Sequence, residues 1–163
     1  MEFLEDGKIV YATYSKGICF SDFITNEYCI FEKGNYVIDI AKGNKNIIWF
    51  ATENNGLIKY ENNNFYFLTA FHGLSSNKIS TVFCDQQGLV WVGTTQNGLN
   101  VLWGDRISYL KKGQGLSSNT INCFFEDKEY RIWIGTENGI DIISFFGTYH
   151  INRNNGLISN KIR

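Results

Sequence analysis

The sequence contains no proline, two histidines and a single methionine among its 163 residues. Proline cannot donate a ladder hydrogen bond, so its absence suits a chain built from paired strands. Long apolar runs are also missing, and no stretch approaches the ~18 residues that a membrane-spanning helix needs. The first residues lack a basic segment followed by an apolar one, so we identify no signal peptide and no membrane segment in this sequence.

An excess of one charge is missing as well, because 15 Lys and Arg face 16 Asp and Glu, for a net charge of −1. Without a basic stripe, nucleic acid is not expected as a partner. The four cysteines form no Cys-x-x-Cys pair, and neither histidine is near them in the sequence, so we predict no metal site and no cofactor. We interpret the cysteines as small buried hydrophobes; one disulfide would form in an oxidising compartment. These residues are Cys19, Cys29, Cys84 and Cys123.

What the sequence does contain is an internal repeat. Trp49, Trp91 and Trp133 follow one another at intervals of 42 residues, and each has a small residue two positions later and a threonine three positions later. A weaker copy runs from Val10 to Ile18, with Thr13 in the threonine position and no tryptophan. The segment Gly-Leu-Ser-Ser-Asn occurs at 73–77 and 115–119, and returns as Gly-Leu-Ile-Ser-Asn at 156–160. A period of ~40–45 residues with a recurring tryptophan and glycine is typical of a four-stranded propeller blade.

The repeat predicts an all-β fold, a β-propeller with about four four-stranded antiparallel blades of ~42 residues in one region, 1–163. We expect the units to span 1–34, 35–76, 77–118 and 119–155, with 156–163 starting the next. Within the third unit we expect strands at 79–84, 89–94, 99–103 and 106–111. The dipeptide Asn97-Gly98 predicts a type I′ hairpin turn.

Most repeated residues have a structural interpretation. Large tryptophans suit the packing between adjacent blades, with Val10 in that position of the first unit, and stacking on a ligand is the alternative. A small residue two positions later indicates a close approach of backbone or of the facing tryptophan. The threonines are expected to form hydrogen bonds across each hairpin. The small residues are Ala12, Ala51, Gly93 and Gly135, and the threonines are Thr13, Thr52, Thr94 and Thr136.

Two aspartates and the Gly-Leu-Ser-Ser-Asn segment allow two interpretations each. Asp85 and Asp127 each stand six residues before a tryptophan, where they are expected to stabilise a turn. Acid–base catalysis by such a pair is the alternative. The serines and asparagines suit a capped connection between blades, although hydroxyl and amide groups also suit sugar binding.

Function is expected where the sequence departs from the repeat, because a fold and its sites are separate matters. Aromatic and histidine residues at such positions are our candidates for ligand contact, and packing in the core or at an edge is the alternative for each. They are Tyr66, His72, Trp103, Tyr109, Tyr149 and His150.

The two motifs in fixed order resemble the two-component regulator propeller repeat. The third unit carries the pattern as Leu74-Ser-Ser-Asn-Lys-Ile79, Asp85, Gly88, Trp91-Val-Gly-Thr94 and Asn97-Gly98-Leu99. The fourth unit follows from Leu116 through Asp127 to Thr136, whereas the second lacks the Leu-Ser-Ser-Asn entry and the first keeps little of the pattern. The resemblance implies a periplasmic sensing region of a membrane-bound hybrid sensor kinase, with glycan fragments as ligands and without enzymatic activity. No ligand-binding residue is carried over from it.

The function expected from the sequence is therefore a ligand-sensing propeller segment of a bacterial two-component receptor, with an oligosaccharide ligand. A structural or dimerisation scaffold without a small-molecule ligand is the alternative, and an enzyme has no nucleophile motif or unrepeated carboxylate pair to support it. The blades are expected to form a closed ring of four, a part of a longer propeller, or half of a ring that a second chain completes. An unclosed ring would expose a blade face and favour self-association.

Overall fold

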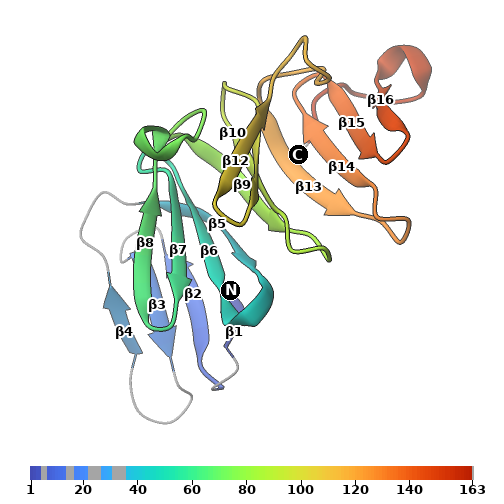
Figure 1. Cartoon of the computed structure of the whole chain (residues 1–163). Helices are drawn as coiled ribbons and strands as arrows, with labels where there is room; N and C mark the ends of the chain where they lie inside the picture. Colours follow the sequence, from blue (N-terminus) through green and yellow to red (C-terminus); the bar gives the residue numbers. More distant parts are fainter. Residues whose placement is uncertain (5–6, 14–16, 22–26, 31–35, 163) are drawn as a thin grey trace.

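The computed structural model of the protein describes residues 1–4, 7–13, 17–21, 27–30 and 36–162. The described residues form four antiparallel sheets of four strands, so the prediction of an all-β propeller is confirmed (Figure 1). The first sheet holds β1 (Glu2–Phe3), β2 (Ile9–Thr13), β3 (Gly17–Ser21) and β4 (Glu27–Ile30), and the second holds β5 (Val37–Lys42), β6 (Ile48–Thr52), β7 (Leu57–Glu61) and β8 (Asn64–Leu68). The third holds β9 (Ile79–Cys84), β10 (Val90–Thr94), β11 (Leu99–Trp103) and β12 (Arg106–Leu110), and the fourth holds β13 (Ile121–Glu126), β14 (Ile132–Thr136), β15 (Gly139–Ser144) and β16 (Gly147–Ile151).

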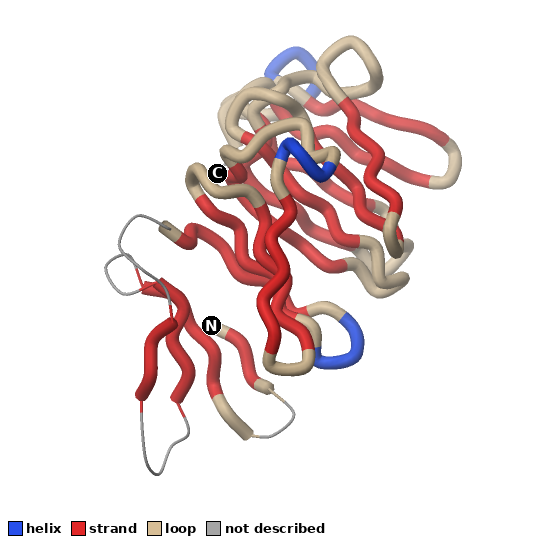
Figure 2. The backbone as a smooth tube through the Cα atoms, turned by 60° about the vertical axis from the view of Figure 1, so that its left-hand side comes forward, coloured by secondary structure: helices blue, strands red, loops and turns tan. Residues whose placement is uncertain are grey.

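Within each sheet the strands follow one another in chain order, and the blades fan out from their first strands (Figures 1 and 2). Strand β9 contacts both β5 and β13, so the first strands of consecutive blades lie against one another. Short 3-10 turns are present at η1 (Asn44–Asn46), η2 (Ala70–His72) and η3 (Arg153–Asn155). The predicted boundary between the first two units, at 34 and 35, lies outside the described residues.

The strands of the third blade agree with the prediction to within one residue at each end, but its predicted turn is wrong. A type I′ turn needs positive φ at both central residues. Gly98 has φ +78°, whereas Asn97 is not among the residues with positive φ. The Thr94 hydroxyl accepts the Asn97 N–H at 2.8 Å, which holds a longer loop in place. Two adjacent positive φ angles instead occur at Asn62 and Asn63, between β7 and β8.

Apolar layers fill the spaces between consecutive blades. Val10 and Phe20 of the first blade pack against Phe50 and its neighbours in the second, and all three are fully buried. The next layer contains Trp49 from β6 and Val92 from β10. Burying one such side chain contributes about 1.5–3 kcal/mol. The layers between neighbouring blades therefore contribute substantially to the stability of the fold.

The last of these layers confirms a packing role for Trp91. Its ring centroid lies 6.3 Å from that of Phe124 in the fourth blade, and it is surrounded by Leu99, Ile121 and Ile134. Only 7% of Trp91 is exposed. Trp91 thus packs against a neighbouring blade and is covered by it.

The repeated threonines close the hairpins, as the sequence predicts. The hydroxyl of Thr94 donates to the Gly98 carbonyl at 2.7 Å, and Thr52 and Thr136 make the same bond at 2.6 and 2.9 Å. All three threonines are fully buried. A buried hydroxyl needs a partner, and the hairpin carbonyl supplies it.

The Gly-Leu-Ser-Ser-Asn segments connect the blades, and their asparagines join each connection to the hairpin before it. The Asn77 carbonyl accepts the Gly56 N–H at 2.9 Å, while its side chain accepts the Ala70 N–H at 2.7 Å. Asn119 and Asn160 repeat both bonds in the next two connections. We name this arrangement the asparagine clamp.

Small residues follow the tryptophans because the next blade approaches closely. A Cβ atom on Gly93 would lie 2.7 Å from Ile121 Cγ2 and 2.8 Å from Thr81 Cγ2. The close approach is confirmed, but the approaching group is an isoleucine of the next blade and not the facing tryptophan.

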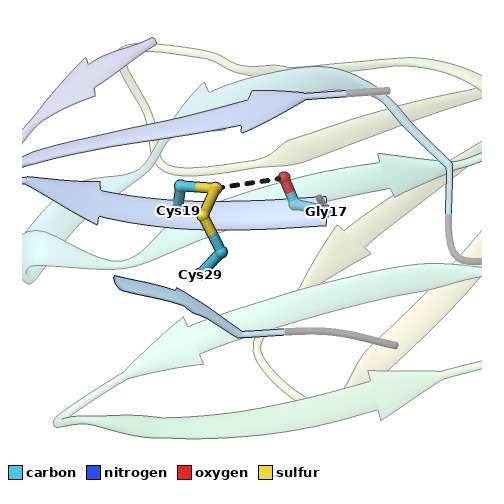
Figure 3. The surroundings of a disulfide bond; sticks show 3 residues. All are labelled: Gly17, Cys19 and Cys29. Atoms are coloured by element: carbon cyan, nitrogen blue, oxygen red, sulfur yellow. Dashed lines mark hydrogen bonds between the residues drawn. A yellow bond between two sulfur atoms is a disulfide. The ribbon is translucent and has the colours of Figure 1, made fainter. Parts of the chain in front are cut away.

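The cysteines differ from the simplest expectation. Cys19 and Cys29 face each other across β3 and β4 and form a disulfide, with Cα atoms 4.0 Å apart (Figure 3). Cys84 and Cys123 are free and half-buried. The interpretation of four buried hydrophobes is therefore wrong for the first pair, because the hairpin register brings two residues ten apart into contact.

Candidate functional site

A cleft of about 560 Å³ runs along the first strands of the blades. Its lining comes from all four sheets: Glu2 from β1, Asp39 to Lys42 from β5, Thr81 to Cys84 from β9, and Cys123 and Phe124 from β13. We name it the central cleft. A ligand in this cleft would contact several blades at once.

Asp39 fixes the geometry of the central cleft. Its Oδ2 accepts the Thr81 hydroxyl at 2.7 Å and the Val82 N–H at 2.9 Å, while its Oδ1 accepts the Ile40 N–H at 2.9 Å. These bonds join β5 to β9 at the point where the β5–β6 register shifts. With three donors on its oxygens, Asp39 acts as a positioning group between two blades.

The ionisable groups at the mouth of the cleft are Glu2 and Lys42, whose Nζ lies 2.6 Å from the Phe3 carbonyl oxygen. Burial, with smaller contributions from the carboxylates of Asp85 and Glu2, raises the pKa of the Cys84 thiol to about 12. Cys84 is therefore a neutral thiol at ordinary pH and not a thiolate nucleophile. The cleft offers hydrogen-bonding groups and one cation for recognition.

The lining positions are those that the repeat leaves variable. Asp39, Thr81 and Cys123 occupy the same place in three blades, each opposite the small residue that follows the tryptophan. Lys42, Cys84 and Glu126 likewise share one place, each opposite the residue before the tryptophan. The repeated strand pairing thus presents a different side chain from each blade at these positions.

A second cleft, of about 630 Å³, lies on the fourth blade. Phe125, Trp133, Ile142 and Tyr149 stand directly opposite one another across its four strands and form one row on one face. We name this face the open face. Phe145 and Phe146, in the turn between β15 and β16, extend it and are 98% and 87% exposed.

Asp127 anchors the open face. Its Oδ2 accepts the Trp133 indole N–H at 2.7 Å and the Arg131 Nε at 2.6 Å. Partial burial acts to raise the pKa of Asp127, but the hydrogen bonds from Trp133 and Arg131 outweigh it and hold that pKa well below its usual range. The bond to Asp127 in turn raises the pKa of Arg131, whose guanidinium lies 5.7 Å from the Trp133 ring centroid.

Three of the sequence-predicted aromatic residues lie on the third or fourth strands of the second and third blades. Tyr66 on β8 has the Lys59 ammonium 5.8 Å from its ring centroid, and Lys59 is also 5.9 Å from that of Trp49. Tyr109 on β12 has Lys111 at 4.9 Å in the same way. Trp103 ends β11 and is 69% exposed.

The histidines and Tyr149 lie elsewhere. His72 accepts the Thr69 N–H at 3.1 Å and caps η2. His150 Nδ1 lies 2.6 Å from Asp141 Oδ1, and Asp141 Oδ2 accepts the Ser117 N–H at 2.9 Å. In the third blade, Asn100 occupies the position of Asp141 and accepts the Ser75 N–H in the same way. Because an uncharged amide makes the same bond, Asp141 has a structural role in the fourth blade. Tyr149 lines the open face, and none of the six candidates lines the central cleft.

The central cleft was missed by sequence reasoning because its members share no repeated identity and stand about one repeat apart. The available signal was the variability of the first strand of each unit. Among the described residues, no group of three or more His, Cys, Asp or Glu could hold a metal ion.

The comparison with protein families addresses the repeat directly. The model described as "Two component regulator propeller" matches residues 73–96 and 115–138. Each match begins at a Gly-Leu-Ser-Ser-Asn connection and ends in the hairpin after the tryptophan. Two units of this chain are two-component regulator propeller repeats. A search of curated proteins found no match.

Solved structures similar to these two-component regulator propeller repeats include two named as extracellular domains of hybrid two component systems from B. thetaiotaomicron. The first, of BT3049, has a TM-score of 0.84 at 21% identity and covers 98% of this chain and 23% of that chain. The second, of BT4673, has a TM-score of 0.75 at 17% identity and covers 95% of this chain and 25% of that one. This chain thus spans about a quarter of their length.

Virginiamycin B lyase from Staphylococcus aureus is also similar, with a TM-score of 0.69 at 15% identity over 93% of this chain and 54% of the lyase chain. At these identities the likeness establishes the propeller fold. In the described part of the chain, no helix has the length and apolar character to cross a membrane.

Proposed function

We propose that this chain is a ligand-sensing propeller segment of a bacterial two-component signal-transduction receptor. The observation that carries the proposal is the match of two of its units to the two-component regulator propeller. The likeness to extracellular domains of hybrid two component systems supports it. Sensing also requires a place for a ligand, and the central cleft, lined by residues of all four blades, offers one.

We propose an oligosaccharide as the ligand of the central cleft. Sugars are recognised by polar groups that bond to hydroxyls and by apolar surfaces that cover ring faces. Glu2 and Lys42 supply the first kind of contact, and Phe83 and Phe124 supply the second. With a volume of about 560 Å³, the cleft lies within the usual range of small-molecule sites, about 300–1,000 Å³.

Isothermal titration calorimetry against a broad oligosaccharide panel tests this proposal. Binding should fall at least about tenfold in Lys42→Met and in Glu2→Gln, because each loses one charge-assisted hydrogen bond of about 1.5–3 kcal/mol. Lys112→Met, on an exposed blade connection, is the matched control and should bind as the parent does. No heat across the panel, or equal affinity in all four proteins, would remove the central cleft as the sugar site.

A protein-interaction scaffold without a small-molecule ligand is the second candidate. The observation in its favour is the open face, where Phe125, Phe145 and Phe146 are 63%, 98% and 87% exposed. Exposed apolar patches of this kind mark interaction surfaces. Association without any sugar binding would favour the scaffold over the sensor.

We further propose that the chain catalyses no reaction and that it resides in the periplasm. Repeat-encoded bonds engage Asp85 and Asp127, and Asp141 is held between Ser117 and His150. The Cys19–Cys29 disulfide is of the kind that persists in oxidising compartments. If chromatography detected cleavage of any oligosaccharide of the panel, the absence of catalysis would be contradicted. Recovery from bacterial cells with four reduced thiols would contradict the periplasmic location.

A further inference from the structure

The second blade lacks a carboxylate that the next two blades place on their tryptophans. In those blades an aspartate accepts the indole N–H of the tryptophan six residues later, at 2.8 and 2.7 Å. In the second blade, Gly43 holds the place of the aspartate and Trp49 that of the tryptophan. The same backbone bond closes the turn, from the Gly43 N–H to the Ile47 carbonyl at 2.8 Å. Trp49 is only 8% exposed, and its indole N–H has no acceptor among the described residues.

A cavity of about 160 Å³ is present where the carboxylate is missing. A Cβ atom on Gly43 would lie 3.2 Å from Trp49 Nε1 and 3.6 Å from Cys84 Sγ, so position 43 opens directly onto the indole nitrogen. We name this cavity the indole pocket; Asn44 and Lys59 also line it. A water molecule takes about 30 Å³ in the liquid, so the pocket has room for a small organic anion.

The second blade also places a cation beside its tryptophan. Lys59 stands opposite Trp49 across β6 and β7. The residues in that place in the third and fourth blades are apolar, Val101 and Ile142. The Lys59 ammonium lies 5.9 Å from the Trp49 ring centroid. Glu61 accepts one of its bonds at 2.7 Å, and an ammonium group has three donors. Next to its tryptophan, the second blade thus lacks a negative charge and carries a positive one.

We propose that the indole pocket binds the carboxylate group of a small molecule, in the place that an aspartate side chain holds in the next two blades. The carboxylate accepts the Trp49 indole N–H, and the Lys59 ammonium balances its charge through a charge-assisted bond. This site does not depend on an oligosaccharide in the central cleft, although Cys84 lines both. A free monocarboxylate and the carboxylate of an acidic sugar share the required chemistry.

Nuclear magnetic resonance of the indole N–H groups tests this proposal on the whole chain. The four tryptophans give four indole signals, and the spectrum of Trp49→Phe identifies the one from Trp49. Sodium acetate should move that signal downfield and leave the other three in place. Sodium chloride at the same ionic strength should move none of them. If no indole signal moves, or if chloride acts as acetate does, the pocket holds only solvent and the proposal fails.

Two substitutions test the residues assigned to the pocket. Lys59→Met should weaken acetate binding at least about tenfold, because one charge-assisted bond is lost. Lys111→Met removes an ammonium that lies 4.9 Å from the Tyr109 ring centroid, outside the pocket, and is the matched control. Gly43→Asp supplies the carboxylate within the chain, and φ of −93° at Gly43 admits a side chain. Its Trp49 signal should already lie downfield and should not respond to acetate. Equal acetate affinity in the parent and in Lys59→Met would overturn the proposal, whether or not Gly43→Asp folds.

Glucuronate and glucose distinguish the two sources of the carboxylate, because only glucuronate carries one. A shift of the Trp49 signal with glucuronate as well as with acetate would assign the pocket to acidic sugars. A shift with acetate alone would assign it to small monocarboxylates. A shift with glucose would contradict recognition of a carboxylate.

Discussion

The carboxylate of Asp85 accepts a hydrogen bond from the indole nitrogen of Trp91 at 2.8 Å. Its other oxygen accepts the Gln87 and Leu89 N–H groups at 3.0 and 2.8 Å, so one side chain holds the turn and the packing residue together. Asp127 and Trp133 repeat the relationship at 2.7 Å. In the second blade, Gly43 stands six residues before Trp49 and cannot supply a carboxylate.

Replacing Asp85 by alanine tests this relationship. Asp85→Ala leaves the buried Trp91 indole and two turn N–H groups without their acceptor, so the free energy of unfolding should fall by about 2–3 kcal/mol. Urea denaturation at one fixed protein concentration measures the change. Asp105→Ala, in the exposed turn after β11, should change stability by less than about 0.5 kcal/mol. Equal losses in both variants would show that the Trp91 bond contributes nothing.

Adding a methyl group at Gly93 tests the contact between the third and fourth blades. Gly93→Ala should lower the free energy of unfolding by about 1–3 kcal/mol, because its Cβ would overlap Ile121 and Thr81. Thr81→Ser removes the methyl group at 2.8 Å but retains the hydroxyl that bonds to Asp39. The alanine substitution should therefore be less destabilising in the Thr81→Ser background. Additive losses would contradict the proposed overlap.

Asp127 should make the stability of the folded protein depend on pH in the acidic range. Its pKa is lowered in the folded protein, so below the unfolded value, about 3.9, the unfolded chain binds the proton more readily. The stabilisation is present above about pH 4 and is lost as pH falls through the folded pKa. Melting temperatures from pH 7 to pH 3 should fall more steeply for the parent than for Asp127→Asn. Parallel curves would mean that the lowered pKa of Asp127 has no effect on folding.

Because Cys19 and Cys29 form a disulfide, we expect two free thiols in the protein and a loss of stability when the bond is removed. Denatured, unreduced protein should take up two iodoacetamide groups, on Cys84 and Cys123, and reduced protein should take up four, as counted by mass spectrometry. Cys29→Ser should lower the free energy of unfolding by about 2–3 kcal/mol in the chain-entropy model, because the closed loop is short. Cys123→Ser, which leaves the disulfide intact, is the matched control. Four alkylated cysteines without reductant would contradict the bond.

The repeat made the blade architecture predictable, since a tryptophan at a fixed interval and a threonine three residues later mark the second strand of three blades, and Thr13 alone marks it in the first. Threonine bonding and turn formation by Asp85 were also predictable, because both act within a few residues along the chain. The turn at Asn97 was not, because the Thr94 hydroxyl competes for its N–H. The preference of the Asn-Gly dipeptide for a type I′ turn takes no account of a hydroxyl that binds the asparagine N–H.

Contacts between blades could not be predicted from the sequence, for a different reason. The Asp39–Thr81 bond joins residues 42 apart whose types do not repeat, so no spacing rule identifies it. The pairing of Cys19 with Cys29 depends on the register between β3 and β4, which no motif marks. His150 stood out as a departure from the repeat, but its buried partner Asp141 occupies a position held by Asn100 in the blade before, where an amide suffices.

The asparagine clamp has a consequence for how such a chain changes in length over evolutionary time. Each clamp joins two consecutive units, since the asparagine stands near the start of one unit and the hairpin glycine that it holds lies in the unit before. A duplicated unit would bring an asparagine for the hairpin before it and a hairpin for the asparagine after it, so it would need no compensating change in its neighbours. Whole units can then be gained or lost by recombination, because every hairpin again meets an equivalent asparagine in the unit that follows.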